Sequence, residues 1–159
     1  MDTFTIYLDT SILSAYFDFH KPVRQLITQK WFQYRASAYT LCISPLVLQE
    51  IQKNTDQILL MNMLKLVNSY SFSVLELNDE IFHLAEQYRN KILRQEINDT
   101  IHIAVASYYA LDAIVSWNFR HIVNLKTMTA IQEVNTQYRY GTVRILSLEN
   151  IGGEEYGTF

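Results

Sequence analysis

The run FTIYL at residues 4–8 is followed directly by the polar triplet DTS at residues 9–11. β-Branched and aromatic residues dominate the run, which is typical of a strand buried on both faces of a sheet. Asp, Thr and Ser favour a turn, because their side chains bond to the nearby backbone, and a short helix toward residue 17 follows. A buried strand that leads into a helix predicts the start of an α/β fold.

Strand and helix patterns continue to alternate along the rest of the chain. Apolar or alternating runs predict strands at residues 39–43, 71–77, 113–116 and 142–146. Helical spacing predicts helices at residues 22–35 and 46–51, after a cap at Thr55, after Asn78, from Asn98 or Asp99 to Ala110, and at 128–137. This order predicts a parallel sheet that is covered by helices on both faces.

The composition of the chain fits one compact domain. A chain of 159 residues with 49% hydrophobic content can bury about two-thirds of its unfolded surface. We expect the domain to span residues 1–150 and the Gly-Gly-Glu-Glu segment to lie in a loose tail at 151–159. No apolar run approaches the roughly 20 residues of a membrane span, and the first residues lack the basic start of a signal peptide, so we expect a cytoplasmic protein. Cys42 is the only cysteine, which excludes an intrachain disulfide and a thiolate metal site.

The overall charge gives no sign of a nucleic-acid footprint. The net charge is −3 and the isoelectric point is near 5.8, which counts against a tight, nonspecific binder of nucleic acid. It counts less against a metal-dependent enzyme, because a bound divalent cation inverts the local field around clustered acidic residues.

Four oxygen-bearing side chains recur where an apolar segment meets a turn or a helix start: Asp9, Glu50, Asp99 and Asn118. In an open α/β sheet, the ends of parallel strands and the adjoining helix starts share one edge, so distant segments can meet there. Oxygen ligands gathered in this way are what Mg²⁺ or Mn²⁺ prefers. Clustered carboxylates repel one another unless a cation is present, so the pattern predicts metal dependence.

Each of these side chains also has a purely structural interpretation. Asp9 could simply end a strand, Asp99 could be a helix N-cap, and Asn118 could be a turn residue that tolerates a left-handed backbone. Glu50 lies among apolar neighbours, where an unpaired carboxylate is costly to desolvate, so we expect it to have a partner or a metal. His102 follows Asp99 by one helical turn and could touch the site, although a half-buried histidine with satisfied hydrogen bonds is the more common arrangement.

Taken in order, these motifs resemble those of PIN domains. The resemblance rests on Asp9-Thr-Ser after the first strand, Ser44-Pro45 to Glu50 after the second, Asn98-Asp99 with His102 at a helix start, and the segment SWNFRH at residues 116–121. The resemblance covers roughly residues 4–148. Among PIN domains, the chain looks most like the VapC-type ribonuclease toxins of bacterial toxin–antitoxin pairs. No single motif is specific, whereas their order and spacing together are.

The resemblance implies a three-layer α/β/α sandwich around a parallel sheet of four to five strands. It also implies that Asp9, Glu50 and Asp99 bind Mg²⁺ or Mn²⁺ for hydrolysis of RNA phosphodiesters, that the protein forms a homodimer, and that an antitoxin protein restrains it. The chain departs from the pattern at Asn118, where the family usually has Asp. One negative charge fewer favours a single firmly bound ion.

Other residues near these motifs are candidates for supporting roles. Ser11 and Ser116 are plausible hydroxyl supports, and Ser116 matches a family position often held by Ser or Thr. Arg120 and His121 could contact RNA phosphates, or Arg120 could be a solvated loop charge. The departure at Asn118 keeps a second hypothesis open, a PIN-like RNA-binding or assembly module with weakened catalysis. A phosphoacceptor domain fits poorly, because one Asp instead of an acidic cluster ends the first strand.

Overall fold

A five-stranded, all-parallel sheet forms the centre of the protein. The computed structural model describes residues 3–92 and 96–151. Within these ranges the strand order is β3-β2-β1-β4-β5. The strands are β1 (Phe4–Leu8), β2 (Tyr39–Ile43), β3 (Phe72–Val74), β4 (Ala113–Val115) and β5 (Arg144–Leu146).

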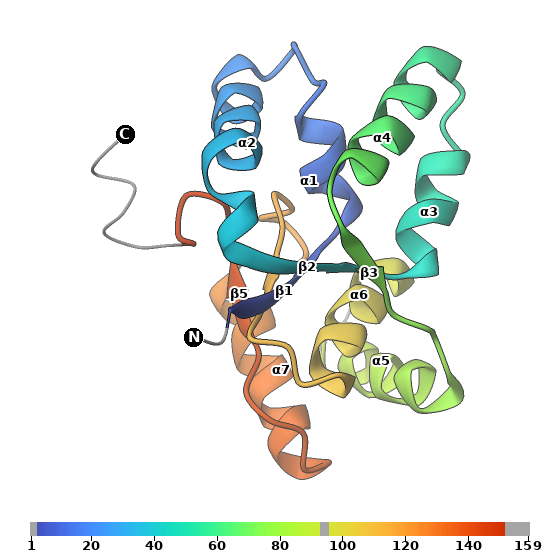
Figure 1. Ribbon diagram of the computed structural model, residues 1–159. Coiled ribbons are helices and arrows are strands. Elements are labelled where there is room, and N and C mark those ends of the chain that lie inside the picture. Colours follow the sequence, from blue (N-terminus) through green and yellow to red (C-terminus); the bar gives the residue numbers. More distant parts are fainter. Residues whose placement is uncertain (1–2, 93–95, 152–159) are drawn as a thin grey trace.

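Helices cover both faces of this sheet. The first half of the chain contributes α1 (Thr10–Ala15), α2 (Pro22–Tyr34), a 3₁₀ turn at Ala36–Ala38, α3 (Pro45–Gln52) and α4 (Gln57–Ser69). The second half contributes α5 (Asp79–Lys91), α6 (Ile97–Tyr108) and α7 (Leu125–Gln137). Figure 1 shows α1 to α4 on one side of the sheet and α5 to α7 on the other. The expected three-layer α/β/α sandwich is therefore confirmed.

The strand order places a topological switch point between β1 and β4. From β1 the chain adds β2 and then β3 on one side, and afterwards crosses to the other side of β1 to add β4 and β5. Leu8 of β1 pairs with Val115 of β4, so the residues that follow these two strands emerge side by side. Ligand sites of open α/β sheets form in the crevice outside such a point.

The core lies between the sheet and its two helical layers. Strand residues such as Ile6, Leu8 and Ile114 are fully buried, as their continuous apolar runs predict. Pro22 and Pro45 occupy first-turn positions of α2 and α3, where the missing N–H of proline has no helical partner to lose. None of the helices in the described ranges is long and apolar enough to cross a membrane.

Several boundaries differ from those predicted by the sequence. The third strand covers Phe72–Val74 instead of residues 71–77, because only this stretch pairs with β2. Asp56, and not Thr55, caps α4 by accepting hydrogen bonds from the N–H groups of Ile58 and Leu59. The last helix starts at Leu125, where Asn124 caps it, and not at residue 128.

The helix that carries Asp99 begins earlier than expected. The N-cap position of α6 is Glu96, so Asp99 lies inside the first turn and is not the N-cap. The expected loose tail at 151–159 lies outside the described residues except for Ile151, which is buried.

Candidate active site

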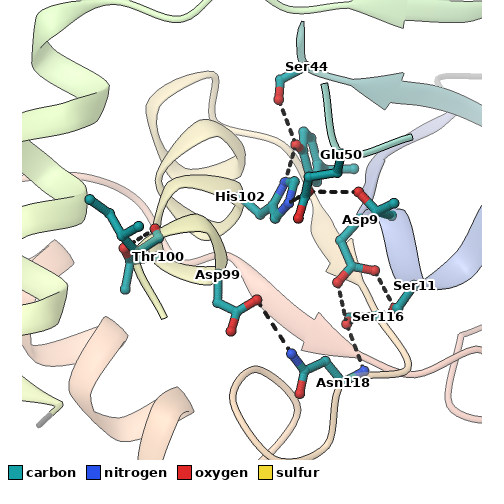
Figure 2. Close-up of polar contacts among 12 residues, drawn as sticks. Asp9, Ser11, Ser44, Glu50, Asp99, Thr100, His102, Ser116 and Asn118 are labelled. Atoms are coloured by element: carbon teal, nitrogen blue, oxygen red, sulfur yellow. Dashed lines mark hydrogen bonds and ion pairs between the residues drawn. The ribbon is translucent and has the colours of Figure 1, made fainter. Parts of the chain in front are cut away.

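Asp9 lies at the switch point, immediately after β1. Its side chain is only 4% exposed, and the two hydroxyl groups that flank it both donate hydrogen bonds to its carboxylate. Ser11 Oγ donates to Oδ1 at 2.5 Å, and Ser116 Oγ donates to Oδ2 at 2.7 Å. Figure 2 shows Asp9 held between these two serines. The predicted hydroxyl supports therefore contact Asp9 directly and fix its orientation.

The loop after β4 completes this side of the site. The backbone N–H of Trp117 donates to Ser11 Oγ at 2.9 Å, and that of Asn118 donates to Ser116 Oγ at 2.9 Å. Each serine thus links Asp9 to the backbone of the loop. The turn that follows β1 and the turn that follows β4 form one hydrogen-bonded unit.

Asp99 and Asn118 approach each other from α6 and the β4–α7 loop. Asn118 Nδ2 donates a long hydrogen bond of 3.4 Å to Asp99 Oδ1, and Figure 2 shows the two side chains aimed at each other. Asn118 Oδ1 accepts a hydrogen bond from the backbone N–H of His121 at 3.0 Å. The structure therefore brings Asn118 to Asp99, but the amide oxygen of Asn118 already has a partner.

Glu50 extends from α3 and forms side-chain hydrogen bonds with His102, Thr10 and Asn98. His102 Nε2 lies 2.6 Å from Glu50 Oε1, and Thr10 Oγ1 donates to the same oxygen at 2.8 Å. Burial raises the pKa of Glu50, but the hydrogen bond and charge of His102 outweigh it, and the net result is a lowered pKa. The partner that the apolar surroundings of Glu50 required is therefore His102.

His102 is the middle member of a buried chain of hydrogen bonds. Its Nδ1 lies 2.6 Å from the Tyr7 hydroxyl, which lies 2.8 Å from Ser44 Oγ. An ionised Glu50 only accepts hydrogen bonds, so Nε2 of His102 donates to it. Nδ1 of His102 donates to the Tyr7 hydroxyl when the ring is charged and accepts from it when the ring is neutral, and the hydroxyls of Tyr7 and Ser44 can adjust to either state. This series of buried hydrogen bonds holds the carboxylate of Glu50 in place.

The site carries excess negative charge in a desolvated setting. Burial raises the pKa of Asp9, and the charge of Glu50 adds to the rise. Burial and the charge of Asp9 together raise the pKa of Asp99 to about 6. These mutual effects show that Asp9, Glu50 and Asp99 lie within electrostatic reach of one another.

The chemistry of these donors fits a hard divalent cation. Carboxylate oxygens are the ligands that Mg²⁺ and Mn²⁺ prefer, and a cation would relieve the repulsion between Asp9 and Asp99. Across the described residues, no three His, Cys, Asp or Glu side chains come close enough together to enclose an ion by themselves. Mg²⁺ commonly keeps several waters and uses one or two protein carboxylates, so a full protein cage is not required.

The two residues predicted to contact RNA phosphates have different surroundings. Arg120 is exposed in the β4–α7 loop. His121 is half-buried, and its charge acts to lower the pKa of Asp99. His121 therefore lies close to the site, whereas among residues 3–92 and 96–151 no contact links the Arg120 side chain to it.

Several residues of this site were not assigned to it by the sequence, among them His102, Thr10 and Tyr7. His102 was expected either to touch the site or to be a half-buried histidine with satisfied hydrogen bonds, and it is 2% exposed and bonded to Glu50. Its spacing of three residues from Asp99 on one helix was the available signal. Nothing in the sequence pairs Tyr7 with His102, because 95 residues separate them. Asp112 lies at the opposite end of the sheet, where it accepts a hydrogen bond from the Thr5 N–H.

Comparisons with known proteins agree with this fold. A family model described as "PIN domain" matches residues 6–122, which is about three-quarters of the chain and spans all four predicted anchors. No protein in a curated sequence collection matches the chain.

Two solved structures resemble the chain in three dimensions. VapC20 of Mycobacterium tuberculosis, described as a sarcin–ricin loop cleaving toxin, has a TM-score of 0.58 at 13% identity over 72% of this chain and 91% of its own. VapBC2 of Rickettsia felis, bound to a DNA fragment from its promoter, has a TM-score of 0.55 at 14% identity over 90% of this chain and 98% of its own. At such low identities the likeness shows a shared fold.

Proposed function

Because the chain belongs to the PIN domain family, we propose that it is a metal-dependent endoribonuclease and the toxin of a toxin–antitoxin pair. The observation that carries this proposal is the pair of Asp9 and Asp99, two desolvated carboxylates whose pKa values are both raised at the switch point of the sheet. Such a pair suits a divalent cation, because a bound cation relieves the repulsion between the two carboxylates.

We assign the cation ligands to Asp9 and Asp99, with Glu50 as the third acidic member. Mg²⁺ or Mn²⁺ held there would neutralise charge on the scissile phosphate and lower the pKa of an attacking water. The chain's own groups have separate tasks. Ser11 and Ser116 keep Asp9 in one orientation, and His102 with Thr10 keeps Glu50 in place to orient that water or to accept its proton.

Asn118, Arg120 and His121 have supporting parts in this proposal. Asn118 donates to Asp99 and therefore limits the repulsion among the carboxylates, although it contributes no charge. This supports one firmly bound cation instead of two. His121 lies near enough to Asp99 to contact a substrate phosphate, and exposed Arg120 can reach one only from the outer rim.

Cleavage of RNA by purified protein tests the proposal. We expect the protein to cut single-stranded or structured RNA in Mg²⁺ or Mn²⁺, to stop when a chelator is added, and to lose activity when Asp9→Asn is introduced. Asp79→Asn, an exposed change of the same type on α5, is the matched control and should retain activity. Cleavage that survives the chelator or Asp9→Asn would falsify the metal-dependent mechanism.

Two parts of this proposal rest on family resemblance: that the protein forms a homodimer and that it binds an antitoxin. Both draw support from exposed apolar side chains on two helices, Leu26 of α2 and Ile58 and Met61 of α4, which are typical of interaction surfaces. Sedimentation of the purified protein tests the homodimer. Expression in a bacterial host tests the toxin: the chain should arrest growth, and the Asp9→Asn variant should not.

The second candidate is a PIN-like RNA-binding or assembly module with little turnover. The Asn118 amide at a position where the family usually has a carboxylate favours it. Calorimetric titration with Mn²⁺ separates the two candidates. Saturable binding below millimolar Mn²⁺ supports the nuclease, whereas RNA binding without such saturation supports the module.

A further inference from the structure

A pocket of about 330 Å³ lies beside the candidate active site. Its walls come from the start of α2, which provides Lys21, Arg24 and Ile27, and from the loop after β4, which provides Trp117 and Phe119. Its volume falls within the range of small-molecule sites and is large enough to take one nucleotide base.

The pocket is joined to the active site through the β4–α7 loop. Trp117 donates its backbone N–H to Ser11, which in turn bonds to Asp9. Asn118 faces Asp99, while its two chain neighbours, Trp117 and Phe119, line the pocket. The pocket and the two carboxylates therefore share one short loop segment, residues 117–119.

The aromatic residues of the pocket are held in fixed positions. Trp117 Nε1 donates to Thr28 Oγ1 at 2.9 Å, and Thr28 is itself bonded to the backbone of Arg24 at 2.7 Å. The guanidinium of Arg24 lies over the Trp117 ring at 5.0 Å and over the Phe119 ring at 5.7 Å. Phe119 remains 41% exposed, so part of its surface is open to a ligand.

The charges of the pocket suit a nucleotide. Lys21 is exposed, and neither Lys21 nor Arg24 forms an ion pair with any carboxylate in the described ranges. Glu149 also lines the pocket, where it would repel a phosphate but can accept a hydrogen bond from the exocyclic amino group of a base. Aromatic faces beside unpaired cations are the usual means of binding single-stranded nucleic acid. Because the net charge of the whole chain is −3, attraction for RNA at this pocket depends on local cations such as Lys21 and Arg24.

We propose that this pocket binds one nucleotide of single-stranded RNA next to the cleaved phosphodiester, with the base against Phe119 and Arg24 and the adjoining phosphate on Lys21. The proposal rests on the proposed ribonuclease function, which it extends by a substrate-binding subsite. A segment of a protein partner is the competing occupant, but the direct link from the pocket through Ser11 to Asp9 favours the substrate.

Photo-cross-linking in chelator tests the subsite without requiring cleavage. The probe is a single-stranded RNA 12-mer that carries 5-iodouridine, and the cross-linked residue is identified by mass spectrometry on the full-length protein. We expect cross-links at Phe119 or Trp117. Cross-links confined to other surfaces would overturn the proposal, whether or not the protein proves to be a nuclease.

Binding of the same RNA by variants is the second measurement. We expect Phe119→Leu to weaken binding about tenfold, because it removes the stacking surface but keeps an apolar side chain. Lys21→Gln should reduce the slope of log affinity against log salt by about 0.7, the value for one lost contact to a single strand. Phe82→Leu and Lys65→Gln, exposed residues on α5 and α4, are the matched controls and should bind as the wild type does.

Kinetics separate the failure of the subsite from the failure of the proposed function. If the protein cleaves RNA, Phe119→Leu should raise KM more than it lowers kcat, and an unchanged KM would overturn the subsite while leaving the nuclease intact. If the protein does not cleave RNA, reduced binding by Phe119→Leu and Lys21→Gln still supports the subsite. Equal RNA binding by all variants, with loss of a protein partner in Phe119→Leu, would assign the pocket to that partner instead.

Discussion

His102 Nε2 lies 2.6 Å from Glu50 Oε1, so a buried imidazole on α6 holds a carboxylate on α3 that is 52 residues away in the sequence. The contact joins the two helical layers across the carboxyl end of the sheet (Figure 2). His102 in turn forms a hydrogen bond with the hydroxyl of Tyr7 in β1. The position of Glu50 is therefore set by a chain of side chains and not by α3 alone, which makes His102 a positioning residue.

Removal of this contact should weaken cation binding. We expect His102→Leu to reduce Mn²⁺ affinity about 10- to 100-fold, as loss of an orienting partner of a metal ligand commonly does, and to lower kcat. His102→Gln should restore part of the loss, because its amide can still donate to Glu50. Calorimetric titration with Mn²⁺ measures the effect. The exposed change His83→Gln is the control, and Mn²⁺ affinity equal to wild type in His102→Leu would show that His102 is only a core residue.

The raised pKa of Asp99 predicts a dependence of stability on pH. Its rise from an ordinary value of 3.8 to about 6 means that the folded state binds this proton more tightly than the unfolded state. Its stabilising contribution is therefore complete below pH 4 and is lost as the pH rises through 6, with an upper bound of about 3 kcal/mol. In chelator, the free energy of unfolding should fall from pH 4.5 to pH 6.5 by more in the wild type than in Asp99→Asn. Denaturant titrations at both pH values measure this difference, and parallel changes in the two proteins would contradict it.

A carboxylate at position 118 should lower the stability of the cation-free protein and raise its affinity for a cation. Asn118→Asp removes the amide that donates to Asp99 and adds a like charge beside it, while it keeps an oxygen for the His121 N–H. Without a cation we expect a loss of about 1–3 kcal/mol, the cost of a lost partner beside a half-buried charge. With Mn²⁺ we expect a larger rise in Tm than in the wild type, because a fourth acidic group strengthens ion binding. Thermal unfolding over a Mn²⁺ series measures both effects. An unchanged Mn²⁺ response would argue against a cation near Asn118.

A buried polar cluster below the sheet gives a prediction that does not involve the active site. The Tyr88 hydroxyl of α5 bonds to Asn135 of α7 and to Ser107 of α6, so it ties three helices together. Tyr88→Phe should cost about 1–3 kcal/mol of stability, because Asn135 Oδ1 is left buried without its donor. Tyr138→Phe removes an exposed hydroxyl that bonds to Gln87 and should cost less than about 0.5 kcal/mol. Equal stability of the two variants would show that the buried cluster contributes little.

Much of the fold could be predicted from local patterns. The boundaries of β1 and β2 agree with the apolar runs, because strands buried on both faces require such runs. The third strand was predicted too long. The alternating pattern spans residues 71–77, but β2 ends at Ile43, which pairs with Val74, so the residues after Val74 have no strand partner there. The start of α6 was also missed, because Glu96 and Asp99 are both acceptable near a helix start and only the packed backbone distinguishes them.

The sequence by itself determined the layered architecture and the four anchors that end its segments, Asp9, Glu50, Asp99 and Asn118, because apolar periodicity and polar breaks are local properties of the chain. Only the tertiary structure decided which side chains contact one another: Ser116 with Asp9, Asn118 with Asp99, and His102 with Glu50. The physical reason is that these contacts depend on the sheet order β2-β1-β4, which brings side chains of α3 and α6 together across the end of β1, and no local pattern carries that information.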